Sequence, residues 1–236
     1  MPVILPSSIQ IGPRATAPAT IQAYLTSIGK ASTYGIWTAG QGMAANSDGT
    51  GSVSSGGAVG CWAPQYNSSL NYKFIQATSA NRPQYTTCSD SVACIAGNGS
   101  SWSLALESTT ALNMAFTLCL SIELMNNTGY VHSQNNDTWS LYGRSSSWSV
   151  PELYHGTKDT ALNTDFTIIR KATGTSYQNI IRIASVSPLS GTGWYNNALT
   201  LFSSAAGFPG SHRIRQICIC PVLTALQQPS LLSLMV

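Results

Sequence analysis

The sequence predicts an all-β domain, built as an antiparallel sandwich or barrel. Short runs of strand-forming residues recur about every ten residues between clusters of Gly, Pro, Asn and Ser, which is the pattern of such folds. The run 115–124 is the clearest strand, because large apolar residues alternate in it with smaller or polar ones, which predicts one buried face. The runs 166–170 and 179–184 flank a Thr-Gly-Thr tip and therefore predict a hairpin.

The first expected element is a short helix with Pro18 in its first turn. Gly29 is a natural stop at its end, and the helix is amphipathic. The residues that share its apolar face are Ile21, Tyr24, Leu25 and Ile28. Before it, residues 1–18 carry prolines at positions 2, 6, 13 and 18, which favour an extended path.

The rest of the chain reads as strands joined by turns. Residues 40–57 are dense in Gly and Ser and predict a loop, and a turn at 126–129 should return the chain antiparallel to the strand 115–124. Strands are expected at 34–37, 58–62, 74–77, 84–86, 92–96, 115–124, 130–133, 138–142, 166–170, 179–184, 198–202 and 212–220.

Strict alternation assigns two faces to the last strand, 212–220. Its first half should be open to water on the arginine side, whereas residues 217–220 are apolar on both faces and predict a central strand covered on both sides. The expected faces are Ile214, Gln216, Cys218 and Cys220 on one side, and Arg213, Arg215, Ile217 and Ile219 on the other.

Charge is the unusual feature of the composition. Only 8% of residues are charged, against about a quarter in typical globular proteins. The 43% of hydrophobic residues exclude a disordered chain. A neutral surface rich in hydroxyl and amide groups suits large permanent assemblies or sugar-facing surfaces. The formal charge of +3 and the thin spread of basic residues predict no nucleic-acid partner.

The cysteines are expected to be free thiols. The N-terminal residues lack the basic start of a signal peptide, and no run approaches the ~18 apolar residues of a membrane span. We therefore expect the chain to fold in a reducing cytosol, without secretion and without a membrane partner. Four of the six cysteines lie within apolar runs and predict buried packing residues. They are Cys94, Cys119, Cys218 and Cys220.

The segment 57–106 carries an ordered set of features. A Trp-containing run at 58–62 precedes the pattern Q-A-T-x-x-x-R-P-x-Y at 76–85, and a strand that closes in Gly97 precedes a larger apolar strand. This order resembles the concanavalin A-like (laminin G-like) jelly rolls of bacteriophage virion proteins, over residues 57–226. Where that family has Phe-Asp-Gly at the strand end, this chain has Ile-Ala-Gly at 95–97.

The resemblance implies an antiparallel jelly-roll β-sandwich of concanavalin A-like type. It divides the chain into an N-terminal arm with its short helix, 1–33, and a jelly-roll domain, 34–236. It also implies a short helix after the last strand, and residues 222–226 fit that helix with Pro221 at its start.

The sequence lacks the patterns of an enzyme or a metal site. The eight acidic residues do not form the paired carboxylates of glucanases on one strand, and no Gly-x-Ser-x-Gly motif is present. Cys218 and Cys220 alone lack the four ligands of structural zinc, and one acidic residue per loop is a weak calcium signal. We expect no catalytic residues, no metal and no cofactor. Glu123, on the clearest strand, is expected to serve as a rim carboxylate or as a hydrogen-bond partner for a loop.

Two loops combine an aromatic ring with amide or carboxylate groups, as sugar sites do. Because the chain has six Trp and ten Tyr, these rings are also candidates for core or interface positions. The candidate carbohydrate-binding residues are Trp139 with Asn135, Asn136 and Asp137 in one loop, and Trp194, Tyr195 and Asn196 in the other.

These observations predict a non-enzymatic structural protein of a phage particle. The leading version is a capsid decoration (cement) protein on the virion surface, a homo-oligomer such as a trimer that contacts the major capsid protein. The alternatives are a tail-fibre or baseplate adhesin that binds host-surface glycan and, third, a glycan-active enzyme. The N-terminal arm lies either along its own domain or on a neighbouring subunit. Its apolar anchors are Val3, Ile4, Leu5, Ile9 and Ile11.

Overall fold

The computed structural model describes residues 20–30, 34–67, 73–107, 116–124, 129–133, 140–143, 153–154, 167–172, 179–186, 200–202 and 212–236. These residues form mainly β-strands, with two short α-helices and one turn of 3-10 helix, η1 (Ser79–Asn81). Every strand pairing in the described part is antiparallel. The prediction of an all-β fold is confirmed.

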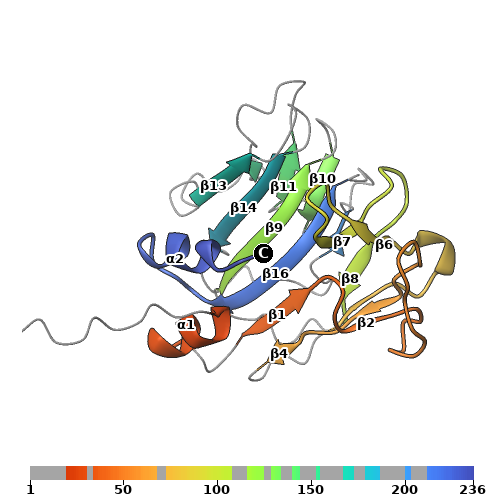
Figure 1. The fold of residues 1–236 in the computed structure, drawn as a ribbon, viewed down its shortest axis with the longest axis horizontal. Helices are drawn as coiled ribbons and strands as arrows, with labels where there is room; N and C mark the ends of the chain where they lie inside the picture. The colour runs from red at the N-terminus through yellow and green to blue at the C-terminus, as the bar shows by residue number, and fades with distance from the viewer. Residues whose placement is uncertain are drawn as a thin grey trace, which may run out of the picture.

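The first sheet holds the long strands, and β14 (Asn179–Val186), β9 (Phe116–Leu124) and β16 (Arg213–Pro221) run side by side through it (Figure 1). The hairpin expected from 166–170 and 179–184 is formed by its two strands β13 and β14. The order of the sheet is β13 (Thr167–Ala172), β14 (Asn179–Val186), β9 (Phe116–Leu124), β16 (Arg213–Pro221), β1 (Gly35–Thr38) and β4 (Tyr66–Asn67); β7 (Ala93–Ala96) also pairs with β16, and β6 (Gln84–Thr87) pairs with β7.

The second sheet consists of shorter strands. Its strand β10 (Gly129–Ser133) pairs with β11 (Ser140–Gly143) and β15 (Thr200–Leu201), so the expectation that residues 130–133 return antiparallel to β9 is wrong. The chain instead passes from the first sheet to the second between Leu124 and Gly129. The order is β12 (Leu153–Tyr154), β11 (Ser140–Gly143), β10 (Gly129–Ser133), β15 (Thr200–Leu201), β8 (Leu104–Leu106), β5 (Phe74–Ile75), β3 (Cys61–Trp62) and β2 (Met43–Ala44).

The two sheets share one hydrophobic core. Trp37 of the first sheet packs edge-on against Phe74 of the second, with ring centroids 5.2 Å apart. Aromatic pairs in this arrangement contribute beyond the apolar area they bury. The core includes Trp37, Trp62, Phe74, Ile95, Leu104, Leu106, Phe116, Leu118, Leu120, Ile122, Leu201, Phe202, Ile214, Ile217 and Ile219.

Two helices, α1 (Ile21–Ser27) and α2 (Gln227–Ser233), cover the outer face of the first sheet. The predicted first helix is confirmed, but it begins at Ile21 and does not include Pro18 in its first turn. Thr20 caps it by accepting the Ala23 amide at 3.1 Å, and Gly29 follows it at φ +72°. The hydroxyl of Tyr24 donates to the Gln227 carbonyl at 2.9 Å and joins the two helices. The second core contains Ile21, Tyr24, Leu25, Tyr34, Ile36, Cys119, Cys218, Cys220, Leu223, Leu231, Leu232 and Met235.

The helix expected at 222–226 is wrong in position. Pro221 is the last residue of β16, and α2 begins later, at Gln227. Pro229 lies in the first turn of α2, where backbone N–H groups have no helical acceptor, so the proline removes no helical hydrogen bond.

Strand β9 is buried on both faces, whereas the alternation predicted one buried face. The second face carries Thr117, Cys119, Ser121 and Glu123. Each of its hydroxyl and carboxylate groups forms a hydrogen bond with the backbone of a segment distant in sequence. The hydrogen bonds join the Thr117 hydroxyl to the Leu223 amide, the Ser121 hydroxyl to the Val236 carbonyl, and the Glu123 carboxylate to the Ser89 amide. Polar residues on this face therefore hold loops and the C-terminal segment rather than contacting water.

Strand β16 contains a β-bulge at Arg215. Ile214 pairs with Ile122 and Gln216 with Ser121, so Arg215 is the extra residue on this strand. The bulge shifts the alternation by one, and Ile214 faces the core between the sheets together with Ile217 and Ile219. The expected grouping of Ile214 with Gln216 is therefore wrong, and so is the expectation that the arginine side is open to water, because Arg215 is buried. The prediction that residues 217–220 are central and covered on both faces is confirmed.

Candidate functional site

The residues predicted from sequence to bind sugar or to form the assembly arm lie outside the described residues. They are Trp139, Asn135, Asn136, Asp137, Trp194, Tyr195 and Asn196, and the arm residues Val3, Ile4, Leu5, Ile9 and Ile11. Their roles therefore stay predictions.

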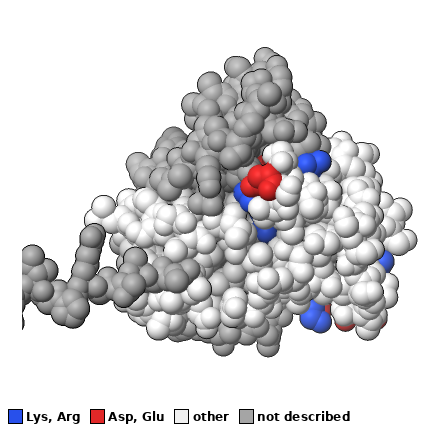
Figure 2. Space-filling view, viewed as in Figure 1, with Lys and Arg blue, Asp and Glu red and all other residues white. Residues whose placement is uncertain are grey.

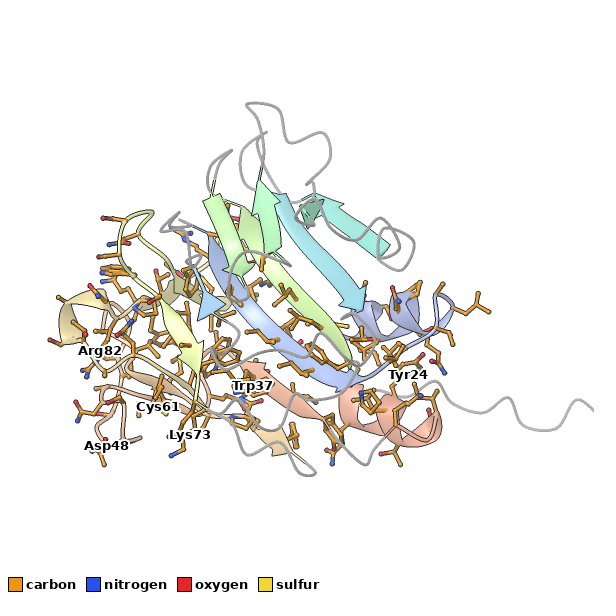
Figure 3. All side chains as sticks on the ribbon, turned by 180° about the vertical axis from the view of Figure 1, so that it is seen from behind. Tyr24, Trp37, Asp48, Cys61, Lys73 and Arg82 are labelled. Carbon is orange, nitrogen blue, oxygen red and sulfur yellow. The ribbon has the colours of Figure 1, made fainter. Side chains whose placement is uncertain are left out.

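The pattern at 76–85 is a structural clasp centred on Arg82. Its guanidinium donates to the Gln76 carbonyl (3.1 Å), to the Ala77 carbonyl (3.3 Å) and to the Ala45 carbonyl (2.8 Å). The bond to Ala45 ties the turn to the loop that contains Asp48. Figure 3 shows Arg82 and Asp48 at the end of the molecule opposite Tyr24. Arginine suits this position because its planar fork serves several acceptors at once.

The strand-borne acid Glu123 serves as a structural anchor. It is fully buried, forms an ion pair with Arg213 at 3.1 Å, and accepts the Ser89 amide at 3.0 Å. Arg215, at the bulge, forms a second ion pair with Asp90 at 2.8 Å. Both acids thereby fix the 87–92 loop against β9 and β16. This matches the expectation that Glu123 is a partner for a loop.

The cysteines are buried, as predicted for Cys94, Cys119, Cys218 and Cys220, and all six are free thiols. A hydrogen bond with Cys220, together with burial, raises the pKa of Cys218 well above its usual value. Burial raises the pKa of Cys119 in the same direction. Since the thiolate is the reactive form, these side chains are poor nucleophiles and act as packing groups.

The described residues contain no group of three or more His, Cys, Asp or Glu side chains that could hold a metal ion. In the loop at 45–51, hydrogen bonds from the hydroxyl and the amide of Thr50 hold the pKa of Asp48 below its usual value. The carboxylate is thus engaged in its own turn. Within the described part of the chain, no helix is both long and apolar enough to span a membrane.

A groove of about 210 Å³ opens at one edge of the first sheet, between α1, β1, β4 and the C-terminal segment. Its lining is drawn from five separate stretches of the chain, and none of the described residues that form it is charged. They are Thr20, Ile21, Gln22, Ile36, Thr38, Gln65, Tyr66, Gln216 and Leu234.

The polar wall of the groove is held by hydrogen bonds around Thr38. The amide group of Gln216 donates to the Thr38 hydroxyl at 2.8 Å, and that of Gln65 donates to its carbonyl at 3.5 Å. Gln216 also accepts the backbone amide of Val236 at 3.1 Å, which fixes the C-terminal residue beside the groove. The wall is therefore preorganised rather than assembled by a ligand.

Exposed apolar residues flank this groove. Tyr66, in its lining, is 49% exposed, and Val236, bonded to Gln216, is 41% exposed. Most of the described atoms on the face shown in Figure 2 belong to uncharged residues. An uncharged groove with an apolar floor and rim suits a polypeptide segment or another neutral ligand, and it lacks groups for acid–base chemistry.

Sequence reasoning did not find this groove. Its residues are distant in sequence, and neither Gln65 nor Tyr66 lies in a motif. The sequence offers one indirect signal. The proline-containing N-terminal segment ends just before Thr20, and Thr20 lies in the groove lining.

Comparison of the chain with protein-family models, with curated proteins and with solved structures found no match.

Proposed function

We propose that the chain is a non-enzymatic structural protein of a bacteriophage particle, and specifically a capsid decoration (cement) protein on the virion surface. The observation that supports this most is the uncharged groove whose lining includes Thr20, the first described residue after the proline-containing N-terminal segment. Its partners would be further copies of itself, in a trimer or similar ring, and the major capsid protein.

The use of charge in the described residues supports a structural role. Glu123, Asp90 and Asp48 are each engaged in holding a loop, and Arg82 is bound to backbone carbonyls. An enzyme that uses carboxylates needs a pair free to meet a substrate. The two antiparallel sheets with a shared core are compatible with the concanavalin A-like jelly roll that the sequence resembles, and we propose that topology for the whole domain.

Antibody labelling of intact particles tests this function. Particles purified from a lysate in which the protein is produced would be labelled with gold-conjugated antibody against it and imaged by electron microscopy. Label spread over the capsid is the expected result. Label confined to the tail tip would favour the adhesin, whose candidate sugar-binding loops are 135–139 and 194–196. Absence of label from washed particles, with the protein in the soluble fraction, would reject the proposal.

A further inference from the structure

We infer that the groove between α1, β1 and β4 receives residues 7–12 from a second copy of this chain, added as a strand along β4. This inference rests on the proposed function in one respect, namely that the protein acts as an assembled subunit. It identifies the surface and the segment through which the copies join.

The first step is the position of β4 in its sheet. Among the described residues β4 pairs on one side with β1, through Gly35 with Asn67 and Ile36 with Tyr66, and it ends the strand order of the first sheet. An edge strand offers backbone N–H and C=O groups to an added strand. Tyr66 and the preceding Gln65 also line the groove, so a strand added here would lie over it.

The second step is the chemistry of the groove. The buried Ile21 and Ile36 form an apolar floor together with the partly buried Leu234, while the walls carry hydroxyl and amide groups. Such a surface accepts an uncharged strand that is apolar on one face and polar on the other.

The third step is that the chain carries a segment of this kind. Residues 7–12, Ser-Ser-Ile-Gln-Ile-Gly, form a proline-free stretch between Pro6 and Pro13. In an extended conformation Ile9 and Ile11 share one face and Gln10 points to the other. The segment has no charged residue, as the groove lining has none among its described residues.

The fourth step identifies the donor as a second copy. Ile11 lies nine residues before Thr20, and the prolines at 13 and 18 favour an extended connection. Nine extended residues span about 30 Å, which is comparable to the diameter of a small domain. Since Thr20 itself lines the groove, the isoleucines of the same chain would be carried well past it. The groove of a neighbouring copy is then the surface they meet.

The oligomeric state of the full-length chain tests the inference directly. By sedimentation velocity, Ile9→Asp/Ile11→Asp should convert the oligomer to monomer, whereas the matched change Gln10→Asp on the opposite face should leave it intact. On the groove side, Gln22→Trp should block the site and give monomer. Thr26→Trp, on an exposed residue of the same helix that is not among the groove-lining residues, is its control. Equal far-UV spectra and melting temperatures show that each variant folds.

Cross-linking between copies decides whose arm occupies the groove. A chain with Ser8→Cys would be mixed with a chain with Tyr66→Cys, and the mixture oxidised; the native thiols are buried and do not compete. A cross-linked dimer of the two variants is expected. A disulfide that forms within a chain carrying both changes, and not in the mixture, would place the arm on its own domain and overturn the inference.

A wild-type chain that sediments as a monomer at every concentration tested would overturn the inference. So would a host-surface glycan that binds the wild-type chain and no longer binds Tyr66→Ala. The proposed function fails separately. If the variants behave as expected but washed particles carry no label, the groove and arm join copies of a protein that is not a virion component.

Discussion

The indole ring of Trp37 lies over the backbone of Gly35, two residues earlier on the same strand. A Cβ atom added to Gly35 would come within 2.5 Å of Cη2 of Trp37. The ring cannot easily move away, because it is fully buried and packs against Phe74. Glycine is required here for close approach, on a strand that lies between β16 and β4.

The first prediction follows from this contact. Gly35→Ala should destabilise the protein by about 1–3 kcal/mol, because the added methyl group overpacks a closed core. In a Trp37→Phe background, which removes the ring atoms nearest to Gly35, the same change should cost markedly less. Chemical denaturation of the four proteins of this double-mutant cycle gives the coupling. Strictly additive effects would show that the ring does not set the requirement for glycine.

The second prediction concerns the central part of β16. Ile219 belongs to the core between the sheets, so Ile219→Ala should lower the free energy of unfolding by about 2–5 kcal/mol. Leu226 is 88% exposed and is the matched control, for which Leu226→Ala should change stability by less than about 0.5 kcal/mol. A loss below half a kcal/mol for Ile219→Ala would place this side chain at the surface.

The bulge at Arg215 shows why part of this strand was predictable and part was not. Alternation placed Ile217 and Ile219 on one face correctly, because local periodicity decides that relationship. Ile214 was misplaced because β16 changes neighbours at this point, from β7 at Ile214 to β1 at Gln216. A change of neighbouring strand is a property of the tertiary fold. The only local indication of it in the sequence is the pair of adjacent polar residues Arg215 and Gln216, which interrupts the alternation.

The same distinction applies to the rest of the fold and to the groove. Most strands and α1 were recognisable because their patterns are local, but the pairing of β10 with β15 and the covering of the second face of β9 depend on distant segments. The groove depends on them most, since Ile21, Tyr66 and Leu234 meet only in the folded chain. The residues predicted for sugar binding lie outside the described part and remain predictions.

The third prediction is a loss of stability at alkaline pH. Folding raises the pKa of three thiols. Burial is the main cause for Cys61 and Cys119, and the hydrogen bond with Cys220 is the largest cause for Cys218. Above the pKa of unfolded thiols, about 8.5, the unfolded chain binds fewer protons than the folded chain. Stability is therefore fully present below that pH and falls as the pH rises above it.

Cys218→Ala isolates one contribution to this loss. Between pH 8 and pH 10 the variant should lose about 2 kcal/mol less stability than the unmodified chain, as one raised thiol pKa requires. Ile219→Val, at a neighbouring residue that does not titrate, should leave the pH dependence unchanged. Urea unfolding under reducing conditions at each pH gives these values. Identical alkaline slopes for Cys218→Ala and the unmodified protein would contradict the prediction.

The fourth prediction tests the clasp of Arg82. Arg82→Ala should lower the free energy of unfolding by about 1.5–3 kcal/mol, the range for hydrogen bonds with a charged partner. Arg82→Lys retains the charge but cannot serve the carbonyls of Ala45 and Gln76 together, so it should recover only part of the loss. Hydrogen exchange should quicken at Asn46, whose amide is bonded within the adjoining loop. Full recovery by lysine would mean that charge, and not geometry, matters here.

The last prediction separates the arm from the fold. A chain that lacks residues 1–17 keeps Thr20, which caps α1 by accepting the Ala23 amide, and keeps Ile21 and Leu25 in the second core. It should therefore unfold with the same midpoint as the full chain, measured at a concentration where the full chain is monomeric. At higher concentration the full chain should sediment as an oligomer and the shortened chain as a monomer, because the segment proposed to join the copies is gone. A shortened chain that assembles as well as the full one would show that the copies meet through another surface. A shortened chain that melts well below the full one would show that the arm stabilises its own domain.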